Sequence, residues 1–310
     1  MKSLLSALLL CIGVALRPTG AVAAAAAYVI SDDTTGYILE SVAPIKKLQV
    51  GSLTKIATAM VVLDWAEARS VDLGQMATVP ASAANLATPA GIGFQPGDRC
   101  SLRELLYAAM MQSDNQAAET LAEHVGRALG SGELAPVDEF VKQMNALARK
   151  LGMTRTRFLN AHGLDTLERT LPYSTAEDLA KLTAYAEGHS AFRFYVSQKE
   201  RKIAYESATG EAAAFLLRNT NQLIGTDDID GVKTGTTRRA GQCLVISAAK
   251  PPDSRQVGER HEITPRRLNI VVLGSEDRFN EASALLRRGW QLYNAWAAAG
   301  RPTKGWKGLR

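Results

Sequence analysis

Residues 28–39 read YVISDDTTGYIL, with two short, β-prone apolar runs on either side of a polar turn that ends in Gly36. This pattern predicts a β-hairpin near the amino terminus. Strand patterns return only late in the chain, over residues 229–233, 242–249 and 268–274. Segments that are far apart in the sequence must therefore close one sheet.

The residues between these strands follow helical spacing instead. Helices are expected from Ser52 to about Ala68, from Leu102 to near Gln112 behind a capping box of Ser101 and Glu104, over residues 117–129 and 137–151, over 175–187 opened by Ser174 and Glu177, and over 278–297. Residues 80–98 are expected to form a loop, and the polar, proline-containing stretch over residues 251–267 is expected to separate the last two strands. We therefore predict an α/β fold of the α+β type. Its antiparallel sheet is flanked by helices, with a mostly helical subdomain over roughly residues 70–190.

The composition is that of a globular protein with a sizeable core, since 46% of the 310 residues are hydrophobic and 22% are charged. The formal net charge is +5, and removal of a leader containing Lys2 and Arg17 leaves 5 − 2 = +3. That charge is too small to indicate nucleic-acid binding. The four histidines show no ligand spacing, so we predict neither a metal site nor a cofactor. Cys100 and Cys243 would remain in the mature chain, and their pairing stays open.

The amino terminus has the pattern of a signal peptide over residues 1–23. Lys2 precedes an apolar run over residues 4–16, and small residues follow at 21–23. This run is short for a membrane span, which needs about 20 residues. We expect export to the periplasm or another extracytoplasmic space. A catalytic domain would cover residues 24–299, and a basic tail over 300–310 would make at most peripheral membrane contact.

The first candidate for chemistry is Ser52-Leu53-Thr54-Lys55 at the start of a predicted helix. A spacing of three places the hydroxyl and the amine on one helix face. A lysine can take a proton from serine if burial or another cation lowers its pKa. The alternative is that Ser52 caps the helix and Lys55 is solvated.

Two further patterns contain residue types that suit a catalytic site. Ser113-Asp114-Asn115 lies between two predicted helices, where such residues also serve as caps. Lys233-Thr234-Gly235-Thr236 follows an apolar strand. Its cation, hydroxyl and glycine suit a carboxylate ligand, although an ordinary charged edge strand has the same composition.

Taken together and in this order, the three motifs resemble those of the penicillin-recognising serine acyl-transferases, which are the penicillin-binding proteins and class A β-lactamases. The similarity is greatest to the low-molecular-weight, serine-type D-alanyl-D-alanine carboxypeptidases. It extends over about residues 27–297 and includes the stretches Gly51 to Ile56, Phe158 to Asp165 and Asp230 to Gly235. The resemblance implies their transpeptidase-like fold.

The resemblance also implies roles for individual residues. Ser52 would attack the carbonyl between two terminal D-alanines and form an acyl-enzyme, with Lys55 as proton acceptor and Ser113 as proton relay. The backbone N–H groups of Ser52 and Thr236 would form the oxyanion hole. The substrate-binding residues implied are Asn115, Lys233, Thr234, Thr236, Thr237 and Arg218, with the last two placed at the free carboxylate. The implied partners are peptidoglycan stem peptides ending in D-Ala-D-Ala, and β-lactams as covalent inhibitors.

Three alternatives remain open. A D,D-endopeptidase that cuts peptide cross-links would use the same nucleophile and differ only in the leaving amine. Asp114 in the second motif suggests a β-lactamase. Such enzymes deacylate with a Glu-x-x-Leu-Asn loop, and the nearest match in this sequence, Glu168 to Pro172, has proline in place of the asparagine. A non-catalytic cell-wall binding module would be expected to have lost Ser52, Lys55 or Lys233, and all three are present.

Overall fold

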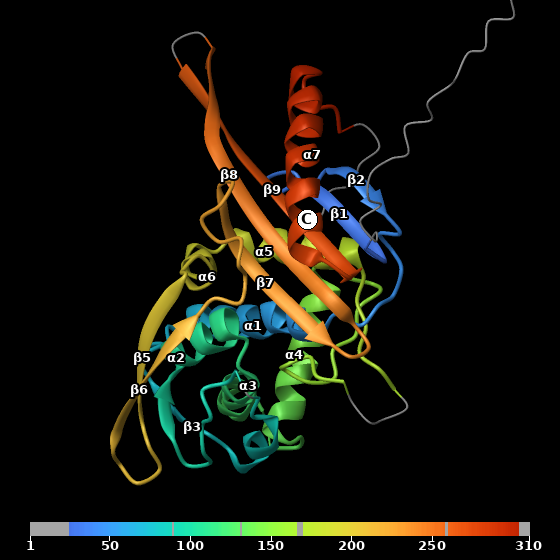
Figure 1. Ribbon diagram of the computed structural model, residues 1–310. Coiled ribbons are helices and arrows are strands. Elements are labelled where there is room, and N and C mark those ends of the chain that lie inside the picture. The colour runs from blue at the N-terminus through green and yellow to red at the C-terminus, as the bar shows by residue number, and fades with distance from the viewer. Residues whose placement is uncertain (1–24, 89, 131, 166–169, 258–259, 304–310) are drawn as a thin grey trace, which may run out of the picture.

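The computed structural model describes residues 25–88, 90–130, 132–165, 170–257 and 260–303. The amino-terminal hairpin and the late strands form one antiparallel sheet (Figure 1). The order of its strands is β2 (Ile38–Val42), β1 (Ala27–Asp32), β9 (Arg260–Ser275), β8 (Gly241–Val257) and β7 (Ile229–Thr237). The expected closure of the sheet by distant segments is confirmed, since Val29 pairs with Val271.

Both faces of this sheet are apolar, because alternate residues of each central strand point to opposite sides. Ile30, Ile246 and Ile270 pack with helix α7 (Arg278–Ala298). Their neighbours Val29, Val245 and Val271 belong to the larger core on the other face. That core includes helices α1 (Thr54–Arg69) and α5 (Ala176–Glu187). The sheet is therefore the middle layer between α7 and the remaining helices.

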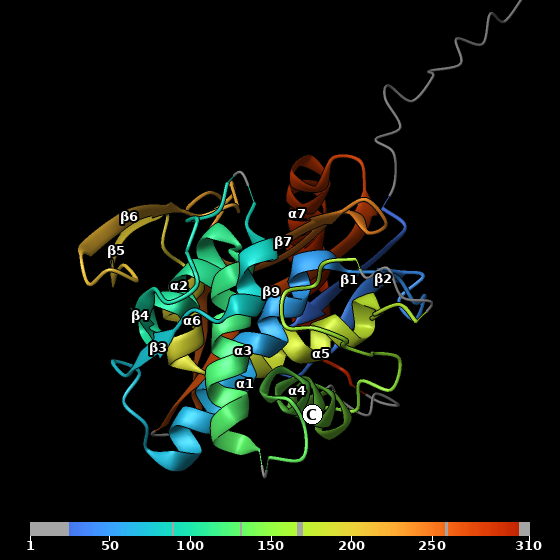
Figure 2. The ribbon, with the colours of Figure 1, turned by 90° about the horizontal axis from the view of Figure 1, so that it is seen from below.

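The part of the chain between β2 and β7 contains most of the helices and a second sheet (Figure 2). Besides α1 and α5, its helices are α2 (Leu102–Tyr107), α3 (Asn115–Leu129), α4 (Pro136–Lys150) and α6 (Ser190–Val196), with short 3-10 helices η1 (Gly51–Leu53) and η2 (Ala81–Leu86) and a π-helix η3 (Ala108–Gln112). The strands of the second sheet are β3 (Met76–Thr78), β4 (Arg99–Ser101), β5 (Glu200–Glu206) and β6 (Ala212–Arg218), in that order. These four strands and α6 were not expected from the sequence.

The expectation that residues 251–267 separate the last two strands is wrong, because β8 and β9 continue through this stretch as a two-stranded ribbon. The ribbon extends beyond the body of the molecule in Figure 1. A register shift between Lys250 and Asp253 accommodates the two prolines, which cannot donate a ladder hydrogen bond. Arg255 then lies opposite Glu262, a favourable cross-strand pair.

The predicted helix caps are correct at one site and displaced at another. Ser101 accepts a hydrogen bond from the Glu104 backbone N–H, as expected for a capping box. Helix α5 is capped one residue later than predicted, because Thr175 and not Ser174 accepts a hydrogen bond from Asp178 N–H. Cys100 and Cys243 are both buried and free of a disulfide. Within the described ranges, no helix has the length and apolar character that a bilayer span requires.

Candidate active site

Ser52 lies in the 3-10 turn that leads into α1, directly beside the end of β7. Gly51 has a φ of +53° and permits this approach, because a Cβ there would lie 3.2 Å from Thr237 Cγ2 and 3.3 Å from Thr236 N. Neither η1 nor α1 is capped by a serine side chain. The capping alternative for Ser52 is therefore wrong, and its partly exposed hydroxyl is available for chemistry.

Lys55 is fully buried and holds its amine against the Ser52 hydroxyl. Its Nζ lies 3.0 Å from Ser52 Oγ, 2.7 Å from Asn115 Oδ1 and 2.8 Å from the His162 carbonyl oxygen. Burial lowers the pKa of Lys55 to about 7, and the negative charge of Asp114 opposes this shift. A substantial share of the amine is therefore uncharged at neutral pH and can accept a proton from Ser52.

In the second motif, Asp114 bonds to backbone groups, whereas Asn115 contacts Lys55. Asp114 caps α3 by accepting a hydrogen bond of 2.8 Å from Ala117 N–H, and it also accepts one of 2.9 Å from Ile92 N–H. Asn115 turns its amide oxygen to Lys55. Ser113 lies between the π-helix and α3 with φ +61°, a left-handed conformation that is uncommon for a residue with a Cβ and is found at functional sites.

The third motif places a second buried lysine next to the first. Lys233 is 1% exposed, and its Nζ donates to the Thr234 carbonyl over 3.1 Å. Burial lowers its pKa well below the ordinary value, and the positive charges of Lys55 and Arg278 lower it further. Gly235 allows β7 to contact the η1 turn that carries Ser52, called the nucleophile turn below, since a Cβ on Gly235 would lie 2.6 Å from Val50 O.

Two residues that sequence reasoning missed complete the edge of β7. Arg278, the first residue of α7, donates from Nη1 to Thr236 Oγ1 over 2.7 Å and to Gly235 O over 3.1 Å. Thr220 Oγ1 lies 2.7 Å from Thr234 Oγ1. Because Thr236 Oγ1 accepts from the guanidinium, its own proton remains available for a ligand. No local pattern marks either residue, because each reaches β7 from a different element.

The two residues expected at the substrate carboxylate have other partners here. The Thr237 hydroxyl donates to Asp165 Oδ1 over 2.9 Å. Arg218, at the end of β6, pairs with Glu200 over 3.1 Å, and its side chain is 72% exposed. Its backbone N–H donates to Gln112 Oε1, which places this residue next to the π-helix that precedes Ser113.

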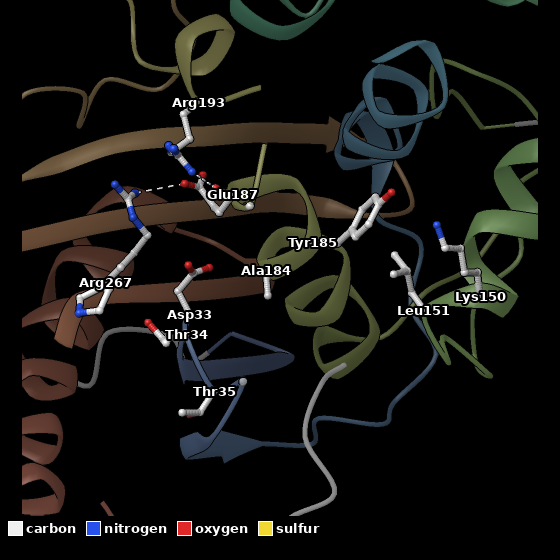
Figure 3. Close-up of a pocket in the computed structure, with 13 residues that line it drawn as sticks. Asp33, Thr34, Thr35, Lys150, Leu151, Ala184, Tyr185, Glu187, Arg193 and Arg267 are labelled. Carbon is white, nitrogen blue, oxygen red and sulfur yellow. Dashed lines mark hydrogen bonds and ion pairs between the residues drawn. The ribbon is translucent and has the colours of Figure 1, made fainter. Parts of the chain in front are cut away.

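A cavity of about 810 Å³ lies elsewhere in the fold and contains none of the three motifs (Figure 3). Asp33, Glu187 and Arg267 contribute its charged wall, and Leu151 and Tyr185 contribute an apolar one. Glu187 accepts a hydrogen bond of 3.1 Å from Arg267 Nη1. The residues with the chemistry of a nucleophile and base lie at η1, α3 and β7, so we place the candidate active site there.

A serine hydroxyl against a buried, partly uncharged lysine, beside a cationic strand edge, is the arrangement that serine acyl transfer requires. The profile of the D-alanyl-D-alanine carboxypeptidase family matches residues 15–257. The chain belongs to this family. It is 34% identical to the D-alanyl-D-alanine carboxypeptidase DacC of Escherichia coli over 87% of its own length and 62% of DacC, so it spans less than two thirds of that relative.

Two further comparisons agree with this assignment. The chain is 31% identical to a D-alanyl-D-alanine endopeptidase of Pseudomonas aeruginosa, over 83% of the chain and 74% of that protein. The crystal structure of the Streptomyces K15 DD-transpeptidase matches with a TM-score of 0.72 and 29% identity, over 86% of this chain and 97% of that one. The predicted transpeptidase-like fold is therefore confirmed.

Proposed function

We propose that this protein is a serine-type D-alanyl-D-alanine carboxypeptidase that removes the terminal D-alanine of peptidoglycan stem peptides. The observation that carries the proposal is the 3.0 Å contact between Nζ of the buried Lys55 and Oγ of the partly exposed Ser52. Ser52 Oγ attacks the carbonyl carbon of the penultimate D-alanine while its proton passes to Lys55. The C–N bond then breaks, and the leaving amine of D-alanine takes a proton through Ser113. Water hydrolyses the ester on Ser52 and restores the enzyme.

The developing oxyanion would be held by the backbone N–H groups of Ser52 and Thr236. The position of Gly51 supports this pairing, because a Cβ on Gly51, the residue before Ser52, would lie 3.3 Å from Thr236 N. Donors preset in this way typically contribute about 3 kcal/mol each to transition-state stabilisation. Asn115 would hold both Lys55 and the substrate backbone.

The terminal carboxylate of the substrate would bind at the cationic end of β7. Arg278 gives this edge a guanidinium, Lys233 gives it a buried amine, and Thr234 and Thr236 give it hydroxyl groups. A bound carboxylate would favour the charged form of Lys233 and so oppose the lowering of its pKa by burial. Arg218 would have to leave Glu200 to join them, and Thr237 would have to leave Asp165. Arg218 and Thr237 stay proposed contacts of the carboxylate. Arg278 is added to them, because it already donates a hydrogen bond to Thr236 on this edge.

Hydrolysis of an N-acylated tripeptide ending in D-Ala-D-Ala tests this function. Wild-type protein should release one D-alanine per peptide, and Ser52→Ala should release none while keeping the same thermal midpoint. Release of D-alanine by the Ser52→Ala variant at the wild-type rate, or none by folded wild type, contradicts the proposal.

The second candidate is a D,D-endopeptidase. It is favoured by one observation, that the chain spans more of the Pseudomonas aeruginosa endopeptidase than of DacC. Cross-linked and linear peptides offered together separate the two reactions by their products. A β-lactamase would need a deacylating carboxylate, and the sequence candidate Glu168 lies outside the described residues.

We also propose that residues 1–23 direct export, and that the peptidase acts in an extracytoplasmic cell-wall space. The support is the sequence pattern alone, since residues 1–24 lie outside the described ranges. The proposed catalytic domain covers residues 24–299, with its helical part over roughly 70–190, followed by the basic tail over 300–310. Mass spectrometry of the protein from an exporting host would show whether the chain begins near residue 24.

A further inference from the structure

The turn over residues 160–165, between α4 and α5, contacts the candidate active site on two sides. One side is the start of α1, and the other is the segment at the end of β7. It is cross-linked internally by Asn160, whose Oδ1 accepts from His162 N over 3.3 Å and from Gly163 N over 2.6 Å. The Asn160 amide also donates to Leu164 O over 3.1 Å. These bonds make the turn a unit that transmits a displacement at one end to the other.

One end of this turn orients the base. The His162 carbonyl accepts a hydrogen bond of 2.8 Å from Lys55 Nζ. Gly163, with φ +82°, packs against the nucleophile turn so closely that a Cβ would lie 2.0 Å from Gly51 O. The turn is therefore in direct contact with the segment that carries Ser52.

The other end of the turn binds the segment that follows β7. Asp165 Oδ1 accepts from Thr237 Oγ1 over 2.9 Å, and Asp165 Oδ2 accepts from Arg239 N over 3.3 Å. Thr237 Oγ1 in turn accepts from Ala240 N over 3.1 Å. A hydroxyl has one proton to donate, so while this contact lasts Thr237 has none for a substrate carboxylate.

We propose that Asp165 is a positioning residue for acyl transfer, acting through Thr237 on the neighbouring oxyanion donor, the backbone N–H of Thr236. The proposal rests on the function proposed above. The geometry that carries it is the packing of Gly51 against both Thr237 Cγ2 and Thr236 N. Thr237 thus lies between the Asp165 carboxylate and the turn that carries Ser52. Loss of its hydrogen bond to Asp165 would allow Thr237, and with it the backbone N–H of Thr236, to move.

An oxyanion donor acts on the transition state more than on the bound substrate, so its displacement lowers kcat and leaves KM nearly unchanged. A small misplacement can cost up to about 100-fold in rate. We expect Asp165→Ala to lower kcat about 10- to 100-fold on the tripeptide substrate, with KM within about twofold of wild type.

Two variants separate this role from direct substrate binding. Asp165→Asn keeps an oxygen that can accept from Thr237 and loses the acceptor for Arg239 N–H, so it should restore part of the lost kcat. Thr237→Val removes the hydroxyl and keeps the methyl group against Gly51. If Asp165 acts through Thr237, the double variant Asp165→Ala with Thr237→Val should be no slower than the slower single variant.

Asp32, at the end of β1, provides a matched control outside the three motifs. Its carboxylate accepts from Thr35 N over 2.8 Å and from Thr35 Oγ1 over 2.6 Å, the same chemistry in the turn between β1 and β2. Asp32→Ala removes both bonds, so it should lower the thermal midpoint and leave kcat per folded molecule unchanged.

The measurements are kcat, KM and the thermal midpoint of each variant as the full chain. The inference is overturned if Asp165→Ala retains wild-type kcat, if its loss lies in KM, or if the two single effects multiply in the double variant. If Asp165→Ala does not fold, Thr237→Val takes its place, because it removes the same contact. Wild-type kcat in Thr237→Val then overturns the inference, and a reduced kcat with unchanged KM supports it. An inactive wild type overturns the proposed function and this inference together, whereas an active wild type with unaffected variants overturns the inference alone.

Discussion

Lys55 decides whether the site can perform acyl transfer, because an ordinary solvated lysine is protonated at neutral pH and cannot act as a base. Burial lowers its pKa to about 7, while three oxygen atoms on Ser52, Asn115 and His162 fix its direction. His162 contributes only its carbonyl to Lys55. Burial and the Lys55 charge lower the pKa of the His162 imidazole to about 3, so the ring is neutral in the working range of pH.

The pH dependence of acylation follows from this shift. The active form of the base is the deprotonated amine, so the rate of acylation by penicillin should rise with pH through the Lys55 pKa of about 7 and level off above it. Rapid-quench labelling from two units below to two units above that pKa measures the profile. Lys55→Ala should lower the plateau about 10²- to 10⁴-fold and remove the step. A flat wild-type profile across this range would exclude Lys55 as the base.

At the scale of elements, the site depends on how closely β7 approaches the start of α1. Gly235 and Gly51 remove the side chains that would separate the strand from the nucleophile turn. Lys233 and Thr234 lie on the same strand, so any outward movement of β7 displaces the proposed substrate-binding edge together with the Thr236 N–H.

Gly235→Ala tests this contact. The new Cβ would lie 2.6 Å from Val50 O, a backbone atom that can move only with the η1 turn. We expect acylation by penicillin to slow by at least about 10-fold in the folded fraction of the variant. Gly289→Ala is the control, because its Cβ meets the ends of the Ile30 and Leu268 side chains on the α7 face of the sheet. The control should lower stability and retain the wild-type rate; equal rates in both variants would argue against the contact.

At the scale of the whole molecule, one group of buried charges couples the stability of the fold to pH. Glu187, at the end of α5, is 2% exposed beside Arg267 of β9. Burial raises its pKa to about 8, and Arg267 opposes the shift. The folded state therefore binds more protons than the unfolded state between the ordinary carboxyl pKa and about 8, so stability falls as pH rises through this window.

Glu187→Gln removes this titration while keeping the shape of the side chain, and Arg267 retains its two 2.7 Å bonds to Asp230. Between pH 5 and pH 8, the wild type should lose about 2 to 4 kcal/mol of unfolding free energy more than the variant does. Urea unfolding of both proteins at several pH values measures the difference. Parallel stability curves would show that Glu187 does not titrate in this window.

The main sheet and the three motifs could be predicted from the sequence, because their signals are local. Apolar alternation marks the hairpin, and each motif is a run of consecutive residues. The ribbon over residues 251–267 was missed because prolines and charges are typical of a loop, while the ribbon is formed by backbone pairing between the two strands, as between Arg255 and Glu262. Strand β5 was missed for a similar reason, since only Ile203 among its seven residues is buried.

The remaining contacts of the site could not be predicted, because they join residues that are distant in sequence. Arg278 reaches Thr236 from α7, and Asp165 reaches Thr237 from the turn after α4. The spacing of Ser52 and Lys55 indicated that they could touch. Burial of Lys55, which lowers its pKa, comes with contacts to α3 and the 160–165 turn. The four residues Ser52 to Lys55 carry no signal for these distant contacts.

The central claim is that Ser52 forms a covalent acyl-enzyme, and peptide mass mapping after incubation with penicillin tests it most directly. The account predicts that the peptide containing Ser52 gains the mass of one penicillin molecule, and that folded Ser52→Ala gains none. An adduct on another residue, or no adduct on folded wild-type protein, would contradict it.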